Sequence, residues 1–214
     1  MNRRDELAEN LAGVQARITN PEVTLIVVTK TYPASDVQIL SDLGVRDFGE
    51  NRNEEGLEKS ALVPGRWHYQ GEIQSRKVRD IASWASVVHS LDTVGHITKL
   101  ASVATEPLDI FLQLSLDGDP SRGGVVESEL SALADTALQS PHLKLIGLMC
   151  VPPVATEPRA TFTEVAAIHR RFVGRYPEAQ SLSAGMSGDF EIAVDCGATH
   201  IRVGSSILGP RSTR

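Results

Sequence analysis

The sequence is poor in cysteine and in clustered metal ligands. Its 214 residues include two cysteines, Cys150 and Cys196, whose separation matches no metal-binding spacing. Both stand among apolar neighbours, which favours buried structural thiols and a reducing, cytoplasmic location. The six histidines are scattered along the chain, so a metal centre is not expected.

A basic surface and a long apolar run are also missing. The formal net charge is −6, and the pairs Arg3-Arg4 and Arg170-Arg171 stand within helical patterns, so no nucleic-acid partner is expected. Residues 1–18 mix acidic and basic side chains, unlike a signal peptide. No apolar run is long enough to span a membrane. With 41% hydrophobic and 22% charged residues, the composition is that of a soluble globular protein.

What the sequence does contain is a regular alternation of strand and helix patterns. Residues 4–18 predict a first helix from the spacing of their apolar side chains. Strands are then predicted at 24–29, 45–49, 66–70, 87–90, 108–116, 143–150, 180–183 and 199–203. Helices are predicted between and after them, at 33–43, 50–60, 73–84, 94–103, 127–138, 161–172 and 189–196, with a final turn at 205–208.

This alternation predicts the fold class. Eight strand–helix units indicate an α/β protein, a single (β/α)₈ TIM barrel domain over residues 1–214 with an extra N-terminal helix. A doubly wound open sheet is the alternative. No linker or break in composition divides the chain, and the tail at 211–214 is expected to be mobile.

Lys30 is the first candidate for chemistry. It closes the run Thr24–Thr29, which is typical of a strand buried on both faces. A lysine held at the rim of a core can lose part of its hydration and its proton. The neutral amine is the form that attacks an aldehyde to give an imine. The alternative is an ordinary strand-end lysine that only reaches water.

Two segments rich in glycine and serine are candidates for phosphate binding. Ser183–Gly188 follows the seventh predicted strand, and Val203–Ser206 follows the eighth. In such barrels these loops commonly bind phosphate, because glycine lets backbone N–H groups approach an anion near a helix N-terminus. Alternation along the last strand turns Arg202 to the face opposite Ile201. Ordinary turns, and an arginine paired with a carboxylate outside the barrel, are the alternatives.

Several other motifs are weak or absent. Gly185–Asp189 departs from the nucleophile-elbow pattern, and no zinc-protease or Walker A motif is present. Glu50 and Asp117 could form a hydrolytic carboxylate pair. His68 is interpreted as a satisfied core or rim histidine. Core filling is the simplest role for three further residues, Trp67, Trp84 and Met149.

Together, an imine-forming lysine, a phosphate cup and an inward arginine suggest pyridoxal 5′-phosphate (PLP). The chain resembles the YggS/PROSC family of pyridoxal phosphate homeostasis proteins over nearly its whole length. The resemblance rests on six ordered segments: 27–31 (VVTKT), 48–52 (FGENR), 67–74 (WHYQGEIQ), 146–149 (IGLM), 182–187 (LSAGMS) and 201–209 (IRVGSSILG).

The resemblance implies a fold like the N-terminal domain of alanine racemase. It implies that Lys30 carries the cofactor as an internal aldimine and that Arg202 faces the pyridine nitrogen. The phosphate is expected at Ser187, Gly204 and Ser205, and the pocket is expected to be lined by Asn51, His68 and Met186. This chain departs from the usual family pattern at Tyr69-Gln70, Glu72 and Ser205.

The resemblance also implies a function. The expected function is that of a non-catalytic carrier, which binds PLP and other vitamin B6 forms and supplies PLP to apo-enzymes. The carrier is expected to be a cytoplasmic monomer. The chain ends soon after the eighth strand, so the second domain of the racemases is expected to be absent. A cation opposite the ring nitrogen disfavours its protonation and weakens the electron sink. The alternatives are a PLP-dependent amino-acid racemase and an unrelated phosphate-binding hydrolase.

Overall fold

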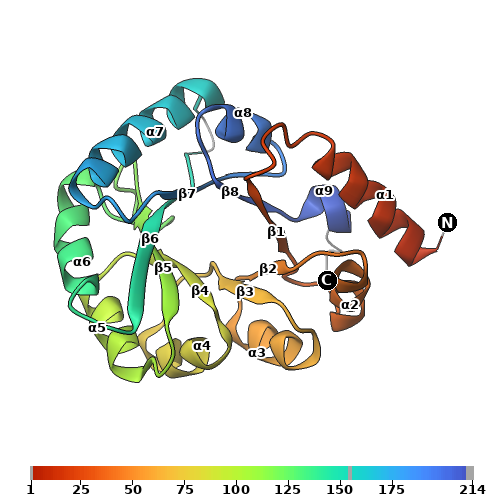
Figure 1. The fold of residues 1–214 in the computed structure, drawn as a ribbon, viewed down its shortest axis with the longest axis horizontal. Helices are drawn as coiled ribbons and strands as arrows, with labels where there is room; N and C mark the ends of the chain where they lie inside the picture. The colour runs from red at the N-terminus through yellow and green to blue at the C-terminus, as the bar shows by residue number, and fades with distance from the viewer. Residues whose placement is uncertain (1, 154–155, 211–214) are drawn as a thin grey trace.

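The described part of the chain forms a closed barrel of eight parallel strands, surrounded by helices (Figure 1). The computed structural model describes residues 2–153 and 156–210, and the tail at 211–214 lies outside them. Each strand pairs with the next one along the chain, and β8 closes the ring against β1, with Thr24 opposite His200. The strands are β1 Thr24–Val28, β2 Asp47–Glu50, β3 Arg66–Tyr69, β4 Val87–Leu91, β5 Leu108–Leu114, β6 Leu143–Cys150, β7 Ser181–Met186 and β8 His200–Val203.

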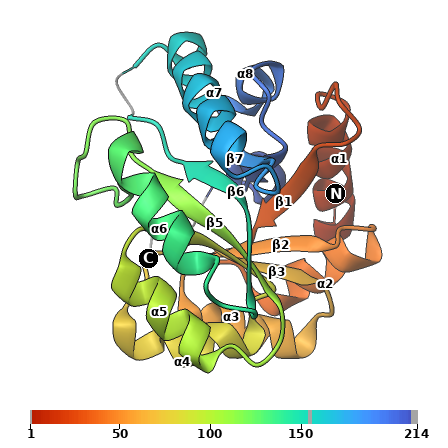
Figure 2. The same ribbon diagram turned by 60° about the vertical axis from the view of Figure 1, so that its left-hand side comes forward.

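The helices form the outer layer, and Figure 2 shows α5, α6 and α7 outside the strands. The added N-terminal helix packs against α2 and α9. The helices are α1 Arg3–Gln15, α2 Ala34–Asp42, α3 Asn53–Leu62, α4 Val78–Trp84, α5 Val94–Val103, α6 Leu130–Ala137, α7 Pro158–Arg175, α8 Phe190–Asp195 and α9 Ser205–Leu208. Short 3₁₀ turns, η1 Ser75–Lys77 and η2 Glu127–Glu129, precede α4 and α6.

The predicted barrel is confirmed, and the open-sheet alternative is wrong because β1 pairs with both β2 and β8. The strand at 143–150 and the helix at 94–103 have the predicted bounds. The seventh strand runs on to Met186 instead of ending at Ser183. Gly185, at a φ of 93°, lets this strand continue through an irregular register against β8.

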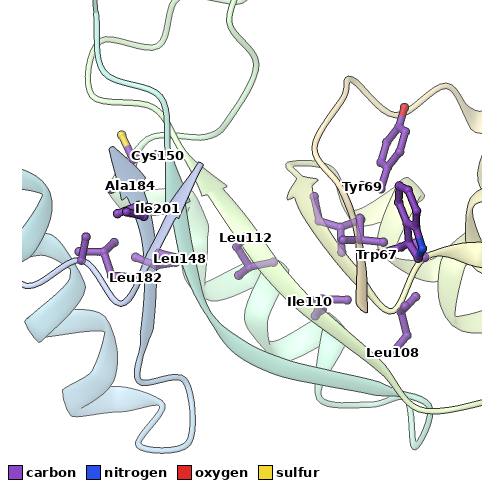
Figure 3. Close-up of a cluster of buried hydrophobic side chains, with 14 of the residues drawn as sticks. Trp67, Tyr69, Leu108, Ile110, Leu112, Leu148, Cys150, Leu182, Ala184 and Ile201 are labelled. Atoms are coloured by element: carbon purple, nitrogen blue, oxygen red, sulfur yellow. The ribbon is translucent and has the colours of Figure 1, made fainter. Parts of the chain in front are cut away.

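The main apolar core joins the strands to the outer helices. Figure 3 shows part of it, including Leu112, Leu148 and Ile201. The rings of Trp67 and Trp84 pack edge to face with their centroids 6.4 Å apart, as expected for core residues. A second, small cluster joins β4, β5 and β6 through Val87, Phe111, Ile146 and Met149. Each large side chain buried in these clusters contributes about 1.5–3 kcal/mol to stability.

The sequence predicts neither a membrane-spanning segment nor a metal centre. Within the described residues, no helix is both long and apolar enough to cross a membrane, and no group of three or more potential metal ligands occurs. Both cysteines are free thiols. Cys150 is buried as expected, whereas Cys196 is partly exposed because it caps the C-terminal end of the short helix α8.

Candidate functional site

A cavity of about 360 Å³ contains the predicted site. It lies where β1, β2, β3, β6, β7 and β8 end, which is the face on which such barrels place their chemistry. Every predicted site residue except His68 is among its described lining residues. These are Val28, Lys30, Tyr32, Asn51, Gln70, Met149, Val151, Met186, Ser187, Gly188, Arg202, Gly204 and Ser205.

The backbone that presents Lys30 is held by α3. The carbonyl oxygen of Thr29 accepts a hydrogen bond of 2.9 Å from Lys59 Nζ, and the Thr29 hydroxyl donates to Glu50 Oε1 at 2.6 Å. Lys59 also pairs with Glu50 at 2.6 Å and with Glu55 at 3.0 Å. This buried ion cluster therefore fixes the main chain immediately before Lys30.

Glu50 takes part in this cluster and not in a hydrolytic pair. Its side chain is fully buried and faces Lys59, and burial raises the pKa of its carboxyl in spite of that cation. Asp117 lies in the segment after β5, where it pairs with Arg122. Each carboxylate thus has its own cation, and the possible pair of Glu50 and Asp117 is not formed.

The two glycine–serine segments come together at one side of the cavity. Ser187 Oγ accepts hydrogen bonds from the backbone N–H groups of Gly204, at 3.3 Å, and Ser206, at 3.4 Å. A Cβ at position 204 would lie 3.1 Å from the carbonyl oxygen of Val28. Glycine therefore lets β8 pass closely over β1, and its N–H group remains beside the cavity.

Arg202 points into the barrel, as predicted from its strand alternation. Its Nη1 donates to the carbonyl oxygen and the hydroxyl of Ser183, at 2.8 and 2.7 Å, and its Nη2 donates to the carbonyl oxygen of Cys150 at 2.9 Å. The alternative, pairing with a carboxylate, is not seen among the described residues. Burial lowers the pKa of Arg202 to about 10, so it remains charged at neutral pH.

His68 does not reach the cavity lining. Its fully buried ring lies deeper in the barrel, between Asp47 at 3.0 Å and His89 at 2.9 Å. Asn51, by contrast, is at the cavity, and its amide donates to the carbonyl oxygen of Gln70 at 3.3 Å. A Cβ on Gly71 would lie 2.0 Å from the carbonyl oxygen of Asn51, so only glycine fits beside this segment.

Sequence reasoning missed several lining residues. Alternation could have found Gln70, because it shares a strand face with His68. Of the departures from the family pattern, Gln70 and Ser205 reach the cavity wall. Tyr69 instead packs edge to face on Trp84 and donates to the carbonyl oxygen of Glu72.

Comparison with known proteins identifies the family. A family model described as the N-terminal domain of alanine racemase matches residues 3–212. A pyridoxal phosphate homeostasis protein of Mycobacterium leprae is 39% identical over an alignment of 246 residues, which covers 100% of this chain and 96% of the relative. This chain belongs to the pyridoxal phosphate homeostasis protein family. The family predicted from the sequence is therefore confirmed.

Two further members support the assignment. The pyridoxal phosphate homeostasis protein of Corynebacterium glutamicum is 40% identical over 200 residues, covering 88% of this chain and 90% of its own. The structure of PipY from Synechococcus elongatus, solved with PLP bound, has a TM-score of 0.87 and 31% sequence identity. The match covers 95% of this chain and 100% of PipY.

Proposed function

We propose that the protein binds PLP reversibly through Lys30 and supplies it to apo-enzymes without turnover of a substrate. The observation that carries the proposal is a single cavity lined by a lysine, an arginine and two glycine–serine segments. The names of the relatives and the PLP-bound structure of PipY support it. The whole chain, 1–214, would act as one binding domain.

The residues present fit the chemistry of PLP. The amine of Lys30 would form a carbon–nitrogen double bond with the aldehyde carbon and release water, and hydrolysis would reverse the step. The N–H groups of Gly204 and Ser206, now bound to Ser187 Oγ, are donors suited to a phosphate. The guanidinium of Arg202 has donors only, so it suits an unprotonated ring nitrogen. Asn51, Met186 and Ser205 complete the wall.

The lack of turnover is proposed from the groups around the cavity. Among its described lining residues, the titratable side chains are Lys30, Tyr32 and Arg202. A racemase needs a second acid or base besides the lysine. The hydroxyl of Tyr32 donates to the carbonyl oxygen of Gly209 at 2.6 Å, and His68 lies below the cavity. Arg202 would also weaken the ring as an electron sink.

A PLP-dependent amino-acid racemase is the second candidate, because the matching family model carries the name of alanine racemase and Tyr32 lies at the cavity. Incubation of the PLP-loaded protein with D- and L-alanine separates the two candidates. Sustained racemisation would select the enzyme, and no turnover above free PLP would select the carrier.

Binding is tested by borohydride reduction followed by mass measurement and peptide mapping. The proposal expects yellow protein that gains one reduced pyridoxyl phosphate on Lys30. A colourless protein, or label on another lysine, would overturn it.

Supply is tested by incubating the loaded protein with an apo-enzyme, either in one solution or on opposite sides of a dialysis membrane. Transfer that needs direct contact occurs only in the shared solution. We also propose that the protein is a monomer, which size-exclusion chromatography would test, and that it accepts further B6 forms, which absorbance titration would test. Its proposed location is the cytoplasm.

A further inference from the structure

A continuous series of hydrogen bonds crosses the barrel interior from Arg202 to the opposite end of the strands. Ser183 Oγ lies 2.7 Å from Arg202 Nη1 and 3.0 Å from His89 Nδ1. His89 Nε2 lies 2.9 Å from His68 Nδ1, and His68 Nε2 lies 3.0 Å from Asp47 Oδ1. The series joins β8, β7, β4, β3 and β2, and it ends at the first residue of β2.

With both histidines neutral, the two ends fix the direction of every bond in the series. Arg202 can only donate, so the Ser183 hydroxyl accepts from it with one of its lone pairs. The carboxylate of Asp47 can only accept, so His68 carries its proton on Nε2 and accepts at Nδ1. His89 must then donate from Nε2. In this neutral arrangement both histidines carry the proton on Nε2, and the Ser183 hydroxyl donates its own proton to the lone pair of His89 Nδ1.

The surroundings favour this neutral arrangement. Ser183, His68 and His89 are fully buried. Burial lowers the pKa of His68 despite the neighbouring Asp47, and it lowers the pKa of His89 well below its ordinary value. A protonated histidine would add a second buried cation near Arg202. The Phe111 ring stacks on the His89 ring, with the two centroids 4.4 Å apart, and this packing restricts the orientation of His89.

The series gives Arg202 a link to an anion that its direct contacts do not supply. Its direct acceptors are the neutral oxygens of Ser183 and Cys150. A buried cation with neutral acceptors is costly, and aligned hydrogen bonds polarise one another in a medium of low dielectric. Asp47, with a side chain 23% exposed, is the charged terminus. A guanidinium held this way has one orientation in the cavity wall.

We propose that Ser183, His89, His68 and Asp47 are positioning residues that lock the guanidinium of Arg202 for its contact with the ring nitrogen of PLP. The inference rests on the proposed function for that contact. It gives His68 a role through Arg202 instead of a place in the pocket wall. Disruption of any one bond in the series leaves the guanidinium held only by the carbonyl oxygens of Ser183 and Cys150, and the ring then meets a less ordered cation.

The first test needs no cofactor. Proton–nitrogen NMR spectra of the apo-protein should show His68 and His89 as neutral rings protonated on Nε2, and separate, slowly exchanging guanidinium signals for Arg202. In Ser183→Ala and His89→Phe the guanidinium signals should merge, while Ser183→Thr should keep them apart. His200→Phe is the matched control, because His200 also contacts Phe111 but bonds to Thr199. A ring protonated on Nδ1, or an immobile Arg202 in both variants, would overturn the proposal.

The second test uses PLP. Ser183→Ala and His89→Phe should weaken PLP binding by about tenfold, the effect of one lost hydrogen bond to a charged group, and should shift the absorption maximum of the bound cofactor. His200→Phe should change neither. Wild-type affinity and spectrum in both variants would refute the inference. If the wild-type protein itself fails to bind PLP, the proposed function fails, and the NMR result still decides whether the series holds Arg202. Ser183→Ala removes one oxygen only, so it serves if His89→Phe does not fold.

Discussion

Glu55 accepts a hydrogen bond of 2.7 Å from the backbone N–H of Thr31, the residue that follows Lys30. Thr31 has a φ of 71°, a conformation that is rare for a β-branched residue and costs about 1–3 kcal/mol. Burial alone would raise the pKa of Glu55, but its bonds with Thr31 and Lys59 lower it overall. The carboxylate of α3 thus holds a strained turn, and that turn directs Lys30 toward the cavity.

Replacement of Lys59 by methionine is expected to destabilise the protein by about 3–5 kcal/mol, because it leaves the buried carboxylate of Glu50 without its cation. Urea unfolding monitored by circular dichroism measures the loss. The double variant Lys59→Met with Glu50→Gln should recover most of it, since the buried charge is then also gone. Equal stability of the single and double variants would show that the charge pair is not the cause.

Replacement of Lys30 by alanine should abolish the retention of PLP and leave the stability of the protein almost unchanged. The side chain is only partly buried, so the free energy of unfolding should change by less than about 1 kcal/mol. Retention of PLP after gel filtration should be lost, because the covalent link needs the amine. Lys99→Ala, in α5, is the control and should stay yellow. A Lys30→Ala protein that fails to fold would mean that Lys30 is structural.

Local patterns were sufficient to predict the barrel and to bring Lys30 and Arg202 to the cavity. Lys30 stands at the end of a continuous apolar run, which places it at the carboxyl end of the first strand. Alternation along the last strand turns Arg202 to the face opposite Ile201. The seventh strand was predicted too short because Gly185 resembles a loop residue. Its φ of 93° instead continues the strand with a bulge, a choice decided by packing against α8.

The depth of a side chain inside the barrel could not be predicted in this way. His68 and Gln70 alternate to the same face, yet Gln70 lines the cavity and His68 lies below it. Interior residues of a barrel fill layers, and the layer depends on how the strands are staggered. The meeting of His68 with His89 and Ser183 joins three strands, so it follows from tertiary register and not from any local pattern.

Replacement of Ser187 by alanine should weaken the binding of PLP by about tenfold, as expected for one lost hydrogen bond to a charged group. Pyridoxal, which has the aldehyde but lacks the phosphate, should bind equally well to the variant and to the wild type. Absorbance titrations with both compounds measure the difference. Ser128→Ala, at an exposed serine of η2, is the matched control. A similar loss for both compounds would place Ser187 away from the phosphate.

Stability should fall in mild acid because the interior histidines are held neutral. Burial lowers the pKa of His200 from 6.5 to about 4. Between these values the unfolded chain binds more protons than the folded protein, so the free energy of unfolding is full above pH 6.5 and declines as pH falls toward 4. His200 alone should account for about 2 kcal/mol between pH 7.5 and 5. The lowered pKa values of His68 and His89 add to the loss.

Urea unfolding of wild type and His200→Phe across this range isolates the contribution of His200. The phenylalanine ring can still meet Phe111 edge to face, so the variant should fold, and its stability should depend less steeply on pH. The carboxylates with lowered pKa, such as Glu55, lose their contribution mainly below 4.5, outside the range measured. Parallel pH profiles for the two proteins would mean that His200 becomes protonated without cost, and that the barrel interior admits water around it.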